Sequence, residues 1–365
     1  MTLGVTAPPS DLRTALAHAS RFEGVTIARG YFEAVTRRAG ECVVHGWMLL
    51  PDQAFDSLQV YWNGDLVGAA EPVERPDVSK ALPWIPHAGK SGFAVHLPAR
   101  LTEGATVGLL VVLGSRDDRP LARMGTLFRP DTASGAPIPP AALIERVLGH
   151  PNSGYFVVSG LKSFTEFIGP IVKHADSQSA RRILDWGCGC GRVSRHFLHF
   201  LPDLGGPEFY GCDIDGEAIA WCSEHLQPGI FTHIEPWPPT RYDEAMFDVV
   251  VGFSVFTHLS KKAQRAWLAE MRRIIAPGGL FLASTHGDCA ACYRFRDEAV
   301  QALRRGISDE KGDTRCEGIA PPGYYRQVFQ SREYTRREFA KHFDIVEYIE
   351  RGMGNYQDLV VMRRP

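Results

Sequence analysis

The sequence contains no run of about 18 apolar residues, so no segment is predicted to cross a bilayer as a helix. An excess of one charge is also missing, because 40 Lys and Arg stand against 42 Asp and Glu. The resulting net charge of −2 gives no basic field for nucleic acid or an anionic membrane surface. Residues 1–20 lack the basic start and apolar centre of a signal peptide, so we expect a cytoplasmic protein.

Cysteine is sparse, with eight residues in 365, and two of them lie in one glycine-rich stretch. This distribution is not that of a disulfide framework, and we expect free thiols in a reducing compartment. Cys289 and Cys292 have a metal-ligand spacing, but no second pair accompanies them, so we expect no metal. The composition, 44% hydrophobic and 22% charged, is that of an ordinary globular protein, and the length favours two domains.

The first third of the chain has the pattern of short antiparallel strands. Alternating apolar residues precede Asn63-Gly64, and an Asn-Gly pair between two strand patterns is a strong signal for a tight hairpin. Residues 129–140 are rich in Pro, Gly and Ser, which is typical of a linker. The expected divisions are residues 1–27 as a tail or lone helix, 28–128 as a β-sandwich, 129–140 as a linker and 141–365 as an α/β domain.

The expected sandwich resembles small modules attached to bacterial glycan-modifying enzymes. The resemblance rests on Gly46-Trp47, the Val60-to-Val67 hairpin, Arg75-Pro76-Asp77-Val78 and Ser91-Gly92-Phe93. It implies a role in polysaccharide biosynthesis. Trp47, Trp62 and Trp84 are then either core residues or exposed platforms for stacking sugars, and we favour the core because Trp is usually well buried.

The stretch from Arg182 to Phe197 has the pattern of a buried strand, a glycine turn and a helix. This arrangement presents backbone N–H groups and a helix start to a nucleotide-like ligand. Gly187, Gly189 and Gly191 follow the spacing Gly-x-Gly-x-Gly, which differs from the Gly-x-Gly-x-x-Gly of dinucleotide sites. Asp185 would repel a pyrophosphate but favour a cationic amino-acid group, so an NAD-dependent enzyme is a distant alternative.

Residues 185–191 resemble motif I of the class I S-adenosylmethionine-dependent methyltransferases, Asp-x-Gly-x-Gly-x-Gly. The resemblance extends over residues 141–365 and implies a Rossmann-like α/β fold with a seven-stranded sheet that ends in an antiparallel pair. It also implies S-adenosylmethionine as the cofactor. The motif I residues that it assigns to cofactor binding are Asp185, Gly187, Cys188, Gly189 and Gly191.

Further cofactor contacts are expected at the ends of the next strands. Asp213 ends the second strand, where a carboxylate can accept hydrogen bonds from both ribose hydroxyls. The resemblance implies that Ile214 packs on the adenine and that Glu235 meets its amino group. Phe253 follows the fourth strand, in a stretch that resembles motif IV, whose backbone faces the methyl donor.

Two histidines are candidates for a general base, because His258 and His286 each follow a predicted strand at the edge where ligands bind. Either could equally be structural, with His258 holding loop backbone. We expect methylation of a hydroxyl or amine on a sugar, a glycan intermediate or another small metabolite, without a nucleic-acid partner. The alternatives are a non-sugar acceptor, with the sandwich serving homo-oligomerisation, and a scaffold that binds the cofactor without turnover.

Overall fold

The computed structural model describes residues 12–38, 41–98, 107–128, 136–175, 180–294, 304–313 and 318–365. The chain forms two compact units, one of residues 1–135 with 154–165 and the other of residues 136–153 with 166–365. Most of the expected linker, residues 129–135, lies outside the described residues. None of the helices in the described ranges is both long and apolar enough to span a membrane.

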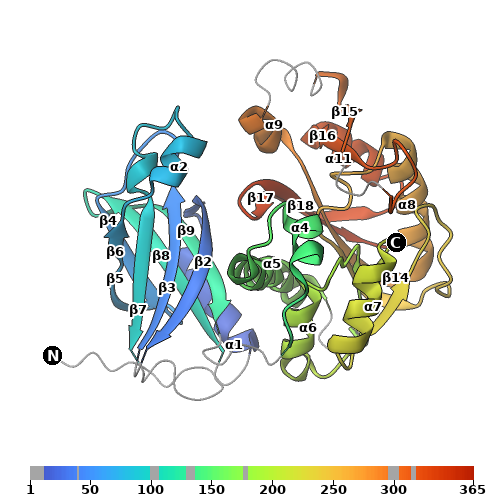
Figure 1. Ribbon diagram of the computed structural model, residues 1–365, viewed down its shortest axis with the longest axis horizontal. Helices are drawn as coiled ribbons and strands as arrows, with labels where there is room; N and C mark the ends of the chain where they lie inside the picture. Colours follow the sequence, from blue (N-terminus) through green and yellow to red (C-terminus); the bar gives the residue numbers. More distant parts are fainter. Residues whose placement is uncertain are drawn as a thin grey trace. The chain divides into compact units, whose positions relative to one another are not determined.

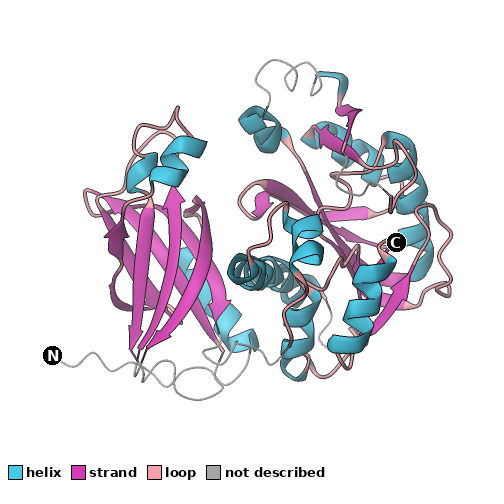
Figure 2. Cartoon of the chain, viewed as in Figure 1, coloured by secondary structure: helices cyan, strands magenta, loops and turns pink. Residues whose placement is uncertain are grey.

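The first unit consists mainly of strands, which Figure 2 shows in magenta. They form a five-stranded sheet in the order β1-β9-β8-β4-β5 and a four-stranded sheet in the order β2-β3-β7-β6. The strands are β1 (Thr26–Ile27), β2 (Arg29–Arg38), β3 (Glu41–Leu49), β4 (Ser57–Trp62), β5 (Asp65–Ala69), β6 (Glu71–Val73), β7 (Gly92–Pro98), β8 (Gly108–Arg116) and β9 (Arg119–Phe128). A short helix, α2 (Pro76–Ala81), lies between β6 and β7.

Both sheets supply side chains to a single apolar cluster, as alternating strand patterns require. The predicted hairpin is present, with Asn63 and Gly64 between β4 and β5 at φ 50° and 80°. Trp47 and Trp62 are buried, as expected of core residues, whereas Trp84 is 49% exposed.

Residues 12–27, expected to be a tail or a lone helix, are part of this unit. Helix α1 (Leu12–Ala17) buries Leu12 and Ala15 completely. Phe22 packs with Leu109 and Val111 of β8, and β1 pairs in parallel with β9. This packing depends on partners far away in the sequence, which the pattern of the segment alone does not specify.

The second unit contains a seven-stranded sheet in the order β12-β11-β10-β13-β14-β18-β17. Figure 1 labels three of its strands, β14, β17 and β18. Neighbouring strands from β12 to β14 pair in parallel, and β18 pairs antiparallel with both β14 and β17. This is the α/β sheet with an antiparallel end that the resemblance implied. The strands are β10 (Arg182–Trp186), β11 (Glu208–Asp213), β12 (Ile230–His233), β13 (Phe247–Gly252), β14 (Ile275–Thr285), β17 (Asp344–Met353) and β18 (Gln357–Arg363).

Helices connect and cover these strands. They are α4 (Ala141–Leu148), α5 (Ser153–His174), α6 (Ser194–Phe200), α7 (Gly216–His225), α8 (Lys261–Ile274), α9 (Asp288–Arg294) and α11 (Arg332–Phe339). Amphipathic α8 buries Trp267 and Met271 in the same cluster as Trp186 of the sheet. The helix ends at Ile274, and Pro277, Gly278 and Gly279 lie within β14. A register shift against β13 accommodates them.

Two further features were not expected from the sequence. Strands β15 (Ile307–Gly312) and β16 (Arg326–Gln330) pair as a separate two-stranded sheet. Helix α5 is divided by its contacts, since Gly154–Thr165 groups with the first unit and the following residues with the second. Pro170 lies inside this helix and cannot donate to the carbonyl of Glu166, so the helix is weakest where the division falls.

Candidate active site

The glycine loop follows β10 and has the backbone that its sequence requires. Gly187, Gly189 and Gly191 adopt φ values of 76°, 53° and 80°, a left-handed region that favours glycine. A Cβ at Gly187 would lie 2.4 Å from Cγ2 of Val255, and one at Gly191 would lie 2.3 Å from Cδ1 of Leu226. The loop is therefore packed closely from both sides, and any side chain there would displace it.

The end of β11 holds this loop in place. Oδ2 of Asp213 accepts a hydrogen bond from the N–H of Gly189 at 2.7 Å, and Oδ1 accepts from the N–H of Asp215 at 2.9 Å. The carbonyl of Cys212 accepts from Gly187 and Cys188. Burial raises the pKa of the Asp213 carboxyl, although the backbone N–H groups oppose that change. The predicted ribose partner thus lies against motif I, and each of its oxygens retains a second lone pair.

Asp185 lies deeper than its predicted role requires. It is 2% exposed, and its Oδ2 accepts a hydrogen bond from the Ser194 hydroxyl at 2.6 Å. Burial raises the pKa of Asp185 to about 7. The carboxyl group therefore connects the end of β10 to the start of α6 beneath the loop.

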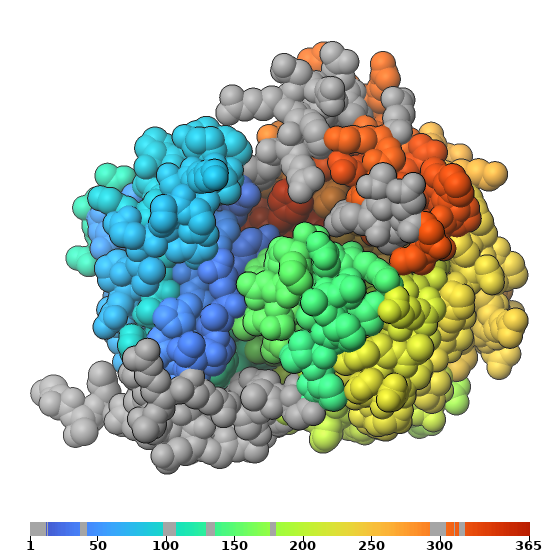
Figure 3. All heavy atoms as spheres, viewed as in Figure 1, coloured from blue at the N-terminus to red at the C-terminus, as the bar shows by residue number. Residues whose placement is uncertain are grey.

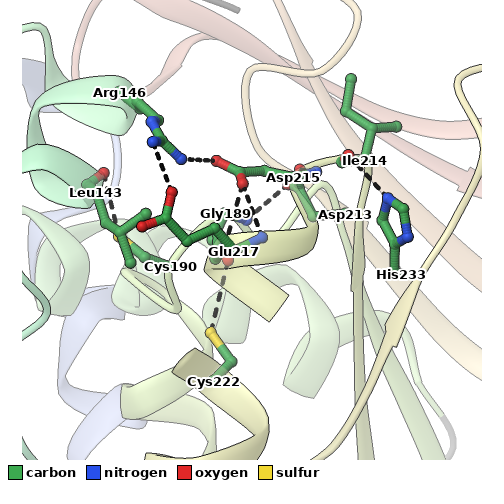
Figure 4. A network of polar contacts seen from close by, with 11 residues as sticks. Leu143, Arg146, Gly189, Cys190, Asp213, Ile214, Asp215, Glu217, Cys222 and His233 are labelled. Carbon is green, nitrogen blue, oxygen red and sulfur yellow. Dashed lines mark hydrogen bonds and ion pairs between the residues drawn. The ribbon is translucent and has the colours of Figure 1, made fainter. Parts of the chain in front are cut away.

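An arginine that sequence reasoning missed connects α4 to α7. Arg146 pairs with Oδ2 of Asp215 at 2.9 Å and with Oε2 of Glu217 at 2.7 Å (Figure 4). Asp215 also caps α7, because its Oδ1 accepts from the N–H groups of Glu217 and Ala218. The surfaces of the α4 and α7 regions, green and yellow in Figure 3, lie side by side.

Two further contacts place α4 directly on the glycine loop. The Cys190 thiol donates to the carbonyl of Leu143 at 3.5 Å, and Cγ2 of Val147 lies 2.8 Å from where a Gly189 Cβ would be. The sequence signal for this helix was only an apolar face, so its target on the loop could not be recognised beforehand.

The remaining predicted cofactor residues differ in exposure. Cys188 is 5% exposed, and burial raises the pKa of its thiol. The carbonyl of Ile214 lies 3.1 Å from Nε2 of His233, while Glu235 is exposed on the loop after β12. The Phe253 ring lies 4.5 Å from the Arg192 guanidinium carbon. The structure therefore places Ile214 beside Asp213 at the end of β11, and Glu235 on an exposed loop after β12.

Past β13, a closed set of hydrogen bonds holds the backbone that resembles motif IV. Ser254 has φ 62°, and its N–H donates to the Ser284 hydroxyl at 2.7 Å. That hydroxyl donates to Oε1 of Gln357 at 2.7 Å, and Nε2 of Gln357 donates back to the Ser254 hydroxyl at 3.0 Å. Strands β13, β14 and β18 are thereby connected at one rim, through residues that sequence reasoning did not single out.

Both candidate histidines bind the backbone of β16. Nδ1 of His258 lies 2.9 Å from the carbonyl of Arg326, and Nδ1 of His286 lies 3.1 Å from that of Val328. Because a carbonyl only accepts, Nδ1 carries the proton in both rings, and Nε2 is the basic nitrogen of the neutral form.

The surroundings of the two rings differ. His258 is 7% exposed and stacks on Tyr325 with the ring centroids 4.1 Å apart. His286 is partly exposed, stacks on Phe329 and meets the Tyr356 ring edge-on at 5.4 Å. His286 therefore has the more open position at the end of β14, whereas His258 is buried with its Nδ1 also 3.8 Å from Oδ2 of Asp313.

Comparison with known proteins assigns the chemistry of this unit. Residues 184–281, from β10 to β14, match the family model described as a methyltransferase domain. Similar solved structures include S-adenosylmethionine-dependent methyltransferases from three organisms. That from Methanosarcina mazei is 16% identical over 53% of this chain and 97% of its own, with a TM-score of 0.39. The structure from Mesorhizobium loti is 14% identical over 55% of this chain and 98% of its own, with a TM-score of 0.39. The structure from Aquifex aeolicus is 14% identical over 54% of this chain and 88% of its own, with a TM-score of 0.35.

The chain therefore contains a methyltransferase domain, whose cofactor is S-adenosylmethionine. The residues present fit this cofactor, because the left-handed glycines leave a loop without side chains beside a carboxylate. Asp213 would hold the ribose hydroxyls, and the backbone of residues 187–191 would lie along the amino-acid part. Within the described residues, no group of His, Cys, Asp and Glu is arranged to hold a metal.

Proposed function

We propose that the enzyme methylates a hydroxyl or amine group of a small neutral acceptor, a sugar or glycan intermediate, with His286 as the general base. The observation that carries this proposal is the hydrogen bond from Nδ1 of His286 to the Val328 carbonyl. It fixes the ring so that Nε2 is the proton-accepting atom at the carboxyl end of β14, the edge where ligands bind in such sheets.

Methyl transfer requires the protein to position the acceptor and to remove its proton. Bound S-adenosylmethionine supplies an electrophilic methyl group, whose bond to sulfur breaks with the electron pair remaining on sulfur. His286 takes the proton of the acceptor, so that the oxygen or nitrogen lone pair can form the new bond to carbon. The hydrogen bonds among Ser254, Ser284 and Gln357 fix the neighbouring backbone, and such positioning accounts for much of the rate in a displacement.

The sugar assignment draws on the first unit, which we propose is a separate β-sandwich domain that serves the same acceptor. Its two sheets and shared core support that architecture. Trp84 is the exposed tryptophan among the three candidates and is the proposed platform for a sugar ring.

The test combines cofactor binding with turnover. Calorimetric titration should show micromolar binding of S-adenosylmethionine, with NAD as the negative control. Asp213→Asn should weaken this binding about tenfold or more, since each charge-assisted hydrogen bond contributes about 1.5–3 kcal/mol. A panel of nucleotide sugars, amines and non-sugar alcohols should then show methyl transfer to a sugar. Transfer only to non-sugar compounds would overturn the sugar assignment, and binding without any turnover would indicate a scaffold.

The role of His286 is tested by His286→Gln, with His258→Gln as the matched control. We expect His286→Gln to lower kcat by about 10²- to 10⁴-fold, the range for loss of a general base, with cofactor affinity unchanged. Activity at alkaline pH should recover in part for an acceptor that ionises by itself. Full activity of His286→Gln with loss of activity in a folded His258→Gln would reverse the assignment.

A further inference from the structure

The turn between β17 and β18 contains a buried side chain that no part of the proposed mechanism uses. The N–H of Tyr356 donates to the carbonyl of Met353 at 3.1 Å and closes the turn. Gly354 and Asn355 between them have φ values of 60° and 52°, as in a type I′ turn. The N–H of Gly354 donates to the carboxylate of Glu166 at 2.9 and 3.0 Å, which fixes the turn against α5.

Asn355 is 1% exposed, and among the residues that the structure describes neither Oδ1 nor Nδ2 of its amide has a hydrogen-bond partner. Leaving such buried groups unpaired costs about 1–3 kcal/mol each. The left-handed backbone does not explain why asparagine occupies this position, because glycine adopts the same φ without burying a polar side chain. A buried amide that is unpaired on both sides indicates a partner from outside the chain, either a ligand or an ordered water.

The hairpin of β4 and β5 provides a comparison. Asn63 occupies a left-handed position in the turn between β4 and β5 and is 5% exposed. Its Oδ1 accepts a hydrogen bond from the N–H of Leu109 at 2.8 Å. Asn63 thus supports its own fold through its side chain, whereas Asn355 makes no such contact.

The position of Asn355 connects it to the reaction. The next residue, Tyr356, meets the His286 ring edge-on at 5.4 Å. The residue after that, Gln357, donates to Ser254 and accepts from Ser284, at the ends of β13 and β14. Asn355 therefore lies at the rim where the proposed base and the motif IV backbone meet.

We propose that Asn355 is an acceptor-binding residue that recognises a neutral group with two adjacent oxygens, such as a vicinal diol. Its amide oxygen accepts from the hydroxyl, and its NH₂ donates to the neighbouring oxygen. This inference rests on the proposed function. An anionic acceptor is disfavoured, because the buried Asp358 and the Glu166 carboxylate lie at the same hairpin. Since the amide is covered, contact requires the turn to move. Gly354 lies within the turn, and Gly352 precedes it in the sequence.

The first experiment is a high-resolution crystal structure of the full chain with S-adenosylhomocysteine, with and without glycerol as a minimal vicinal diol. The proposal is supported if glycerol bonds both amide atoms, or if the amide stays unpaired and faces the space beside the sulfur. An ordered water or a protein group that satisfies both atoms in both crystals overturns it. This readout does not depend on turnover, so it remains decisive if no panel compound is methylated and the proposed function fails.

The second experiment compares Asn355→Gly and Asn355→Asp with the control Asn63→Gly, using a methylated compound from the panel. Both Asn355 variants retain a residue suited to positive φ, and Asn355→Asp also retains the side-chain volume. We expect both Asn355 variants to raise the acceptor KM at least tenfold, which corresponds to about 1.4 kcal/mol. Their affinity for S-adenosylmethionine, and the acceptor KM of Asn63→Gly, should stay within about twofold of wild type. An unchanged acceptor KM in folded Asn355→Gly overturns the proposal, and glycerol in the crystal would then be binding at crystal concentration only.

Discussion

At the scale of single residues, burial sets the behaviour of the motif I carboxyl group. Asp185 has a pKa of about 7 in the folded protein, against 3.8 as its reference value, because the fold removes it from water. The folded state therefore binds its proton more tightly than the unfolded state does. For such a group, the free energy of unfolding falls as pH rises from the unfolded pKa through the folded one.

This predicts a pH dependence that Asp185→Asn removes. Between pH 5 and pH 8 the free energy of unfolding of the wild type should fall relative to Asp185→Asn by about 2–3 kcal/mol, at 1.36 kcal/mol per unit of pKa shift. Denaturant unfolding of the cofactor-free protein at a series of pH values measures the difference. The exposed Asp243→Asn is the control and should follow the wild type. Parallel profiles for wild type and Asp185→Asn would show that the Asp185 carboxyl does not titrate in this range.

At the scale of elements, α4 is a cover on the glycine loop, held by apolar packing and by one arginine. Leu143 and Ile144 are buried, and Arg146 adds the ion pairs to Asp215 and Glu217. Glu217 is 67% exposed, so solvent screens much of that pair. The ion pairs therefore add only a small free energy to that of the apolar packing of α4. A change of that size would alter how often the helix separates from the loop without unfolding it.

Arg146→Met should therefore speed cofactor exchange without unfolding the protein. We expect the dissociation rate of S-adenosylmethionine to rise about three- to tenfold, which corresponds to about 0.7–1.4 kcal/mol, around the upper end of the range for exposed pairs. Stopped-flow displacement measures the rate, and 1 M salt should shift the wild type towards the variant. Arg182→Met, which removes an exposed pair with Glu208 at the start of β10, is the matched control. Equal rates for the two variants would show that Arg146 does not hold the cover.

The elements that could be predicted are those whose signals are local. Asp213 ends β11 and Phe253 follows β13, as predicted, because runs of apolar residues mark these strands in the sequence. Sheet β15–β16 could not be predicted in this way, since what fixes β16 is the pair of bonds from His258 and His286, 68 and 42 residues away. Arg146 and Asn355 could not be predicted for the same reason. The ion pairs of Arg146 and the burial of Asn355 arise only when the chain is folded.

At the scale of the whole molecule, α5 couples two units that otherwise have separate cores. Val158 packs against the core of the first unit, while Phe167, in the second half, meets Phe253 near the glycine loop. The first half contains Gly154 and Gly160, each of which costs about 1 kcal/mol relative to alanine within a helix. Pro170, in the second half, removes the hydrogen bond to the carbonyl of Glu166. The first half therefore depends on tertiary packing for its helical state.

Residues 136–365 expressed alone should consequently fold with the first half of α5 frayed. Exposure of Val158 and its apolar neighbours removes about 2–4 kcal/mol of the free energy gained by burial, because a fully buried apolar side chain contributes about 1.5–3 kcal/mol. Amide exchange of residues 154–165 should then be about 30- to 1000-fold faster than in the full chain, since 1.4 kcal/mol is tenfold. Hydrogen–deuterium exchange with mass spectrometry measures this, and α8 is the internal control because it should exchange alike in both proteins. Equal protection of residues 154–165 in the fragment and the full chain would show that α5 belongs to the catalytic unit alone.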